Sequence, residues 1–196
     1  FAWYLEIQAE APSPAVPQAY ESGCRVNGAT HSRWCVAPTD LTDFIIYRIR
    51  CSPALAQFFK DEFAGTSVAD YRGAYNQVVR ARRRTCLVHL LRELKTVEKY
   101  GRPGPNWPAF AKKLRRLLGD AIQLKKREEV PAEDYASRRG RLTGRLDELI
   151  ATEWEDKDAK RLIKRLRRHR DELLTFLDEP EVPFDNNHGE RGIRPA

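Results

Sequence analysis

The sequence predicts a mixed α/β fold that carries a long helical insertion. Short β-like runs separated by turn residues are frequent in the first third of the 196 residues. β-like and helical segments then alternate as far as residue 100, whereas the spacing of apolar residues over 101–180 is almost entirely helical. Strands and helices in this order indicate a mixed sheet with helices packed against it.

A three-stranded antiparallel meander is expected first. The opening segment, 1–18, ends in the proline-rich APSPAVPQ and is assigned to a linker or to the end of an upstream region. Asn27-Gly28 separates two β-like runs, which is a strong indication of a hairpin. A second turn at 38–40 leads to a third strand over 43–49.

Helices and strands then alternate. Ser52-Pro53 has the residue types of a helix start, and Gly65 is suited to its end. The elements expected next are a strand over 66–70, a short helix over 74–79, a strand over 85–88 and a helix over 89–100. This order, β-β-β-α-β-α-β-α, fits a ribonuclease H-like sheet core over 19–100, although the order alone does not select that fold.

Residues 101–180 predict an all-helical insertion, because apolar residues recur at helical spacing while charged residues fill the other faces. Pro131, Gly140 and Gly144 interrupt the pattern, which argues against one continuous coiled coil. The last segment, 181–196, is expected to start a further, truncated helix. The apolar positions of the insertion are Phe110, Leu114, Leu117, Leu118 and Ile122, then Leu142, Leu146, Leu149 and Ile150, then Leu162, Leu166, Leu173 and Leu177.

The positive charge lies in the second part of the chain. Residues 1–79 contain 6 Lys+Arg and 8 Asp+Glu, while 80–196 contain 29 and 20, so the formal net charge of +7 arises there. Such a basic excess favours a polyanionic partner, most often nucleic acid. Solvated faces of long polar helices are the alternative explanation.

Composition also excludes several classes of protein. No apolar run approaches the roughly 20 residues of a membrane span, so no membrane partner is expected. Four widely spaced cysteines without a CxxC pair fit a reducing cytoplasm better than a zinc site or a disulfide framework. The chain contains no Met, and we expect it to be an internal piece of a longer protein or the product of a damaged reading frame.

Two acidic residues are candidates for metal-dependent chemistry. Asp70 ends a predicted strand, where ligands bind in open α/β sheets; a turn-forming Asp is the alternative. Glu190 falls in the first turn of the helix that Asp185-Asn186-Asn187 would start; a capping box is the alternative. Cutting a phosphodiester with water and joining the freed 3′-hydroxyl to another strand needs divalent metals, and hence carboxylates converging from distant parts of the chain.

A third candidate is the segment Cys86–Arg92. A Cys and a His three residues apart could both bind a metal, but no second pair at suitable spacing accompanies them. His89 is instead expected at a strand-to-helix junction, as a hydrogen-bond donor to phosphate or to a carboxylate. A structural histidine is the alternative.

Six segments, in this order, resemble the catalytic region of the insertion-sequence-sixty-six transposases: ESGCRVNG, HSRWC, RIRCSPALAQFF, ADYRGAYN, RRRTCLVHLLRELK and PFDNNHGERGIRP. These are bacterial enzymes of the DDE type with a ribonuclease H-like fold. The resemblance runs from about residue 19 to the end, and 101–180 matches the family's insertion only in kind. It implies a cytoplasmic protein that binds insertion-element ends, uses Mg²⁺ or Mn²⁺ at a two-metal site and works as a homo-oligomer.

The resemblance also implies roles for individual residues. Asp70 would be the second metal-binding acid and Glu190 the third, with the helical insertion between them. Arg191 and Arg194 would lie near DNA phosphates. The supporting residues would be Asp185, Asn186 and Asn187 at the start of the catalytic helix, and His89 and Arg92 in the family's Cys-x-x-His-x-x-Arg block.

The chain departs from the family pattern at the first acid. Members have Asp-Glu-Thr-Gly-Trp-Arg-Val-Asn-Gly where this chain has YESGCRVNG, so Tyr20 takes the place of the first catalytic Asp. A phenol with a pKa of about 10 is neutral at pH 7 and is a poor ligand for Mg²⁺. Glu21 is adjacent, but neighbouring strand residues face opposite sides of a sheet. Glu21 could substitute only through a bulge or a shift in register.

Two functions fit these observations best. The first is a transposase catalytic domain that cleaves and transfers DNA strands with the help of metal ions. The second is a catalytically inactive DNA-binding remnant, whose binding should weaken steeply with salt. A third, an α+β domain that packs its charged helices against another protein, would be favoured by binding that is insensitive to salt and to divalent metal. The phosphate-contacting residues of the remnant would be Arg80, Arg82, Arg83, Arg84, Lys160, Arg161, Lys164, Arg165, Arg167, Arg168 and Arg170.

Overall fold

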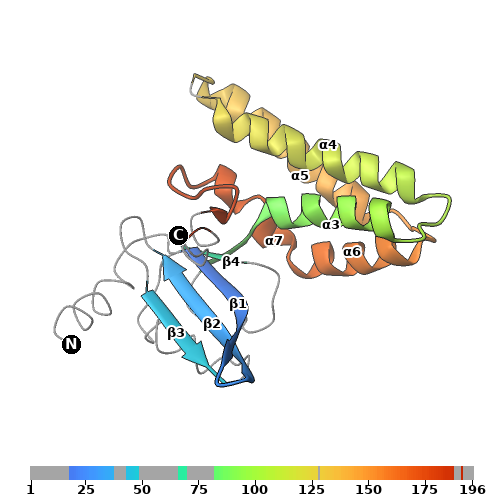
Figure 1. Cartoon of the computed structure of the whole chain (residues 1–196). Helices are drawn as coiled ribbons and strands as arrows, with labels where there is room; N and C mark the ends of the chain where they lie inside the picture. Colours follow the sequence, from blue (N-terminus) through green and yellow to red (C-terminus); the bar gives the residue numbers. More distant parts are fainter. Residues whose placement is uncertain are drawn as a thin grey trace. The chain divides into compact units, whose positions relative to one another are not determined.

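The computed structural model describes residues 18–37, 43–48, 66–69, 82–127, 129–187 and 191. The chain forms two compact units, one of Phe1–Cys86 with Glu181–Ala196 and one of Leu87–Pro180. The first contains the sheet, and the second is helical (Figure 1). The helices predicted between Ser52 and Gly65 and over 74–79 lie outside the described residues.

Five strands form one sheet in the order β3-β2-β1-β4-β5. The first three pair antiparallel, whereas β4 runs parallel to β1 and β5 runs parallel to β4. The mixed α/β class is therefore confirmed, as are the strands predicted to start at residues 43 and 66. The strands are β1 (Gln18–Val26), β2 (Ala29–Ala37), β3 (Asp43–Tyr47), β4 (Thr66–Ala69) and β5 (Arg82–Thr85).

The hairpin between β1 and β2 is determined by its turn residues. Asn27 and Gly28 both have positive φ, 49° and 79°. Positive φ at both central residues characterises the type I′ turn, whose twist matches that of the flanking strands. The predicted hairpin is confirmed. Trp34 and Cys35 of β2 are buried and contribute to the core of this unit.

The strand predicted over 85–88 is wrong at Leu87 and Val88. β5 ends at Thr85, and α3 (Leu87–Tyr100) begins after a single intervening residue. A short apolar run such as Cys-Leu-Val is compatible with either structure, so its neighbours decide. Leu87, Leu90 and Leu94 are fully buried at helical spacing, which makes Leu87 the first residue of the buried side of a helix.

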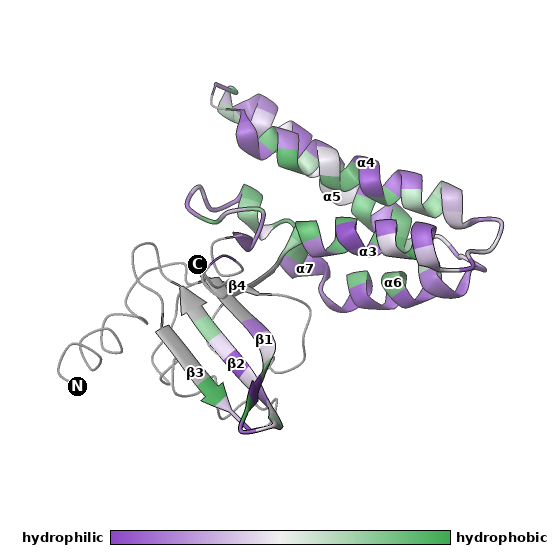
Figure 2. Ribbon diagram, viewed as in Figure 1, coloured by the Kyte–Doolittle hydropathy of each residue, from purple (hydrophilic) through white to green (hydrophobic). Residues whose placement is uncertain are grey.

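The helical unit packs its leucines into one core. Figure 2 shows both apolar and hydrophilic residues along each of its long helices. Phe110, Leu114, Leu117 and Leu118 are buried as predicted, whereas Ile122 is half-buried. α3 packs against α4 and belongs to this unit, although the sequence assigns 89–100 to the sheet core. The other elements are α4 (Trp107–Lys126), α5 (Ala132–Ala151), α6 (Lys157–Arg168), α7 (Arg170–Leu173) and the 3₁₀ turn η2 (Thr175–Leu177).

The helical unit is interrupted at Pro131 but not at the two glycines. Pro131 immediately precedes α5, where its fixed φ is tolerated. Gly140 and Gly144 lie inside α5, so the predicted interruption there is wrong. A helical glycine costs only about 1 kcal/mol, which the burial of Leu142, Leu146 and Leu149 outweighs. In the described part of the chain, no helix is long and apolar enough to cross a membrane.

Candidate active site and its basic surroundings

Strands β1, β4 and β5 run parallel, and their register relates two of the segments that carry candidate site residues. Gln18 pairs with Val68, and Ala69 pairs with Thr85. Tyr20 lies two residues beyond Gln18 along β1, and Cys86 directly follows Thr85. Asp70, the residue after β4 in the sequence, lies outside the described residues.

Tyr20 and Glu21 occupy successive positions in a regular ladder. Tyr20 pairs with Cys35, and Glu21 pairs with Trp34. Every residue of β1 has one partner on β2, so this ladder contains neither a bulge nor a break in register. Glu21 therefore belongs to the opposite face of the strand from Tyr20, and it is only 3% exposed. The rearrangement that Glu21 would need in order to replace the first acid is not present.

The segment after the helical unit returns to the sheet unit and starts a helix. The Asp185 carboxylate accepts hydrogen bonds from the Asn187 backbone N–H (3.2 Å) and from its side-chain amide (2.7 Å). Asn186 is completely buried. The backbone is helical at Asn187 and at Arg191, whose side chain is exposed. This is the geometry of a side chain that caps a helix start; Glu190 and Arg194 lie outside the described residues.

The Cys86–Arg92 block lies at the exit from β5. Cys86, the single residue between β5 and α3 in the sequence, is buried. His89 is half-buried in the first turn of α3, and Arg92 is exposed one turn later. Residues three apart on a helix are neighbours, so His89 and Arg92 share one side of α3. Within the described ranges, no three His, Cys, Asp or Glu residues are grouped as metal ligands would be.

Comparison with known proteins identifies the lineage. The model of the Transposase IS66 family matches residues 10–196. The chain belongs to this family. Its role is accordingly in DNA transposition and recombination, and the resemblance drawn from the sequence motifs is confirmed. No curated protein and no solved structure matches the chain.

In this IS66 family member, some of the basic residues on the surface form ion pairs with acidic residues of the same chain. Arg161 and Arg165 of α6 both donate hydrogen bonds to the carboxylate of Glu93 on α3. Burial acts to raise the pKa of Glu93, but the hydrogen bonds from the two arginines outweigh it and hold the pKa below its usual value. These two arginines are therefore less suited to phosphate than the sequence suggests.

Two further residues among the predicted phosphate-contacting cations of this transposase, Arg167 and Arg170, also have partners within the chain. Arg170 binds the carboxylate of Asp147 at 2.7 Å, and Arg167 donates to the backbone carbonyl of Ile150 at 3.1 Å. Lys160, Lys164 and Arg168 are exposed and form no ion pair in the described part of the chain. Arg82, Arg83 and Arg84 form the first three positions of β5. Sequence reasoning could not separate these groups, because Glu93 lies about 70 residues from its partners.

Sequence reasoning also missed an arginine-rich cavity in the helical unit. It has a volume of about 350 Å³ and lies between the C-terminal part of α4 and the middle of α5. The signal was present in the sequence, since three of the arginines recur on α5 at i, i+3 and i+7. The arginines that line it are Arg127, Arg138, Arg141 and Arg145.

Proposed function

We propose that this chain is the catalytic domain of a metal-dependent DNA transposase with a ribonuclease H-like sheet. The observation that carries the proposal is the strand order β3-β2-β1-β4-β5, with three antiparallel strands followed by two parallel ones. That is the arrangement expected for the predicted β-β-β-α-β-α-β-α order. The helical unit, Leu87–Pro180, would be the insertion between the second and third acids.

The register supports a shared site for the acid positions. Because Gln18 is level with Val68, continuing both parallel strands by two residues would bring Tyr20 and Asp70 level. Cys86, one residue beyond the end of β5, would then lie level with Asp70, because Thr85 pairs with Ala69. Glu190 would be contributed by the helix that Asp185 caps.

The donor set fits a divalent metal in part. Mg²⁺ is commonly held by one or two carboxylates together with waters and phosphate oxygens. Asp70 and Glu190 could provide the carboxylates. When bound, such ions would favour the ionised attacking oxygen and neutralise the leaving one. Tyr20 offers only a neutral phenol at the first acid position. We therefore expect this copy to cleave DNA weakly or not at all until a carboxylate is restored.

Nicking of supercoiled plasmid in Mn²⁺ tests this proposal. The proteins to compare are the unchanged chain, Glu190→Gln, Tyr20→Asp, the matched control Tyr20→Asn, and Tyr20→Asp combined with Glu190→Gln. We expect only Tyr20→Asp to nick. Nicking by the unchanged chain that Glu190→Gln removes would keep the acid assignment but overturn the role given to Tyr20.

A thermal shift supplies a second readout that does not depend on activity. Mn²⁺ should raise the melting temperature of Tyr20→Asp, and adding Asp70→Asn should remove that rise. If no variant nicks and none responds to Mn²⁺, the metal-site assignment is wrong.

The second candidate function is a catalytically inactive DNA-binding remnant. Two observations favour it: Tyr20 at the first acid position, and the three exposed cations Lys160, Lys164 and Arg168 on α6. Duplex binding that weakens steeply with salt, with no nicking by any variant, would support this candidate over the first.

A further inference from the structure

The cavity between α4 and α5 is strongly basic. Besides its four arginines it contains one acid, Asp120, which binds Arg145 at 2.6 Å. The other three, Arg127, Arg138 and Arg141, form no hydrogen bond or ion pair with any residue that the structure describes. Three guanidinium groups thus remain available around one cavity.

This clustering works against the stability of the helix. Arg138, Arg141 and Arg145 follow one another at three- and four-residue spacing along α5. Like charges at such spacing repel and destabilise a helix. Asp120 neutralises only one of these three arginines, Arg145. An arrangement that costs stability in the free protein is one that a bound anion would stabilise.

The chemistry of the lining fits a phosphate group. A guanidinium presents a planar fork of donors that matches phosphate and carboxylate oxygens, and it keeps its charge at every relevant pH. Leu124 and Leu142 are buried and form an apolar wall of the cavity beside the arginines. Apolar walls lower the local dielectric constant and strengthen the attraction between opposite charges.

We propose that this arginine cavity binds a phosphate of the DNA backbone, as a second DNA contact apart from the acid positions. The inference rests on the proposed function, in which DNA is the substrate. Among the described lining residues, Gln123 has the only uncharged polar side chain. One such side chain is too little for the recognition of base edges, which is what reads a DNA sequence. The cavity would thus hold and orient DNA without selecting its sequence.

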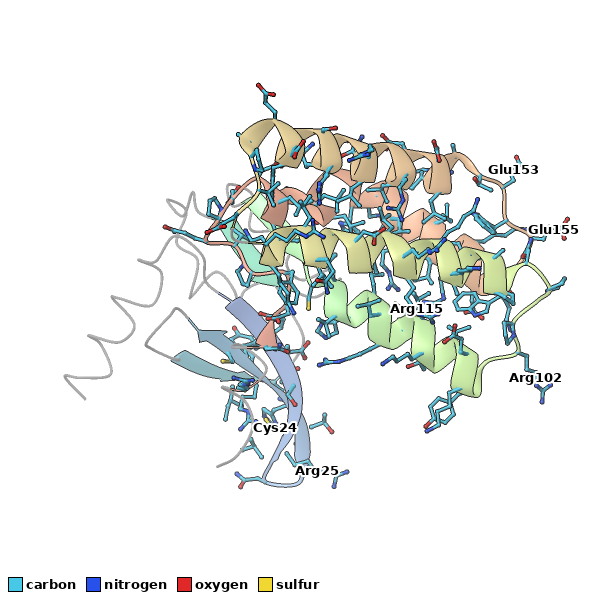
Figure 3. The ribbon with its side chains drawn as sticks, turned by 90° about the horizontal axis from the view of Figure 1, so that it is seen from above. Cys24, Arg25, Arg102, Arg115, Glu153 and Glu155 are labelled. Carbon is cyan, nitrogen blue, oxygen red and sulfur yellow. The ribbon has the colours of Figure 1, made fainter. Side chains whose placement is uncertain are left out.

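Fluorescence anisotropy with a labelled duplex, at several NaCl concentrations, tests the proposal on the full chain. Arg141→Gln should weaken binding about tenfold and make the dependence of log affinity on log salt shallower by about 0.9. The matched control is Arg102→Gln, which removes the same charge from an exposed loop residue. Figure 3 shows Arg102 at the same end of the helical unit as Glu153 and Glu155, where α4 begins, whereas the cavity is near the end of α4.

Two further results separate a binding role from a structural or general electrostatic one. Asp120→Asn should strengthen DNA binding, because it releases Arg145 for phosphate, whereas its control Asp134→Asn should not. The melting temperature of Arg141→Gln should equal or exceed that of the unchanged chain, since a like-charge contact is relieved. Equal weakening by Arg141→Gln and Arg102→Gln, or none by either, would overturn the proposal.

Two small probes identify other anions. If inorganic phosphate raises the melting temperature only when Arg141 is present while DNA affinity is unchanged in Arg141→Gln, the cavity is a small-anion site and the proposal fails. Arg141-dependent binding of a polyglutamate peptide without an effect on DNA would overturn it in favour of an acidic protein partner. Failure of the proposed function can be distinguished from failure of the arginine-cavity proposal, because nicking by Tyr20→Asp is measured independently of the affinity for the labelled duplex.

Discussion

The carboxylate of Asp156 accepts a hydrogen bond from the backbone N–H of Gly104, a residue 52 positions earlier in the chain. The same carboxylate caps α6 by accepting from the backbone N–H groups of Asp158 (2.9 Å) and Ala159 (2.8 Å). Asn106 completes the contact by accepting from the Asp156 backbone N–H. One buried acid thus joins the α3–α4 loop to the start of α6.

Replacing Asp156 by Ala should destabilise the helical unit by about 2 kcal/mol, because three backbone donors lose a charged acceptor. Urea unfolding followed by circular dichroism measures the change. Glu155→Ala is the matched control, since Glu155 is a neighbouring acid whose side chain is exposed. Equal effects of the two substitutions would contradict the role given to Asp156.

Stability should also fall in acid. Burial acts to raise the pKa of Asp156, but backbone hydrogen bonds from Ala159, Gly104 and Asp158 outweigh it and hold the pKa below 3.8. Because the pKa is lower in the folded state, the stabilisation is complete above the unfolded-state pKa and is lost as the pH falls through the folded-state value. Melting temperatures between pH 6 and pH 2 should therefore drop below about pH 4. The drop should be smaller in Asp156→Asn.

Lys125 should anchor the segment that leaves the helical unit. Its ammonium group donates to the backbone carbonyls of Phe176, Glu179 and Pro180 at 2.6, 2.7 and 3.0 Å. Lys125→Met keeps the aliphatic stem and removes these bonds, so we expect a loss of about 1–3 kcal/mol. Lys112→Met, at an exposed position of α4, should change stability little. Hydrogen exchange of residues 174–180 should accelerate only in the first variant.

The glycines of α5 offer stabilising substitutions. A Cβ at Gly140 or Gly144 would meet nothing within 4 Å. Alanine at either position should raise the free energy of unfolding by about 0.5–1 kcal/mol through helix propensity and a less flexible unfolded chain. At Gly101 a Cβ would lie 2.5 Å from the Val97 carbonyl oxygen, so Gly101→Ala should destabilise. The same sign for all three would contradict this reasoning.

The cations of α6 should contribute unequally to DNA binding. Lys164 is exposed and unpaired among the described residues, whereas Arg161 is bound to Glu93 and Asp158. Lys164→Gln and Arg161→Gln each remove one positive charge from α6, and the two positions differ in whether that charge is already paired within the chain. Salt-dependent anisotropy should show the larger loss for Lys164→Gln. A larger loss for Arg161→Gln would mean that the ion pair opens to receive phosphate.

Local chemistry was sufficient to predict much of the fold. Asn27-Gly28 favours the hairpin because both residues accept positive φ, and the structure has it there. The leucine spacing predicts the helices of the insertion. The prediction failed at Leu87 and Val88, because a short apolar run suits either a strand or a helix, and burial of Leu87, Leu90 and Leu94 decides between them.

For the candidate site, the sequence by itself determined the family and predicted the acid positions and the substitution at Tyr20, because these depend on residue identity and order. Only the tertiary structure decided that Glu21 is on the other face of β1, since that depends on an unbroken register with β2. It also decided which arginines are neutralised and which meet in one cavity. Charge pairing depends on distance in space, and Glu93 reaches Arg161 and Arg165 only because α3 and α6 belong to the same folded unit.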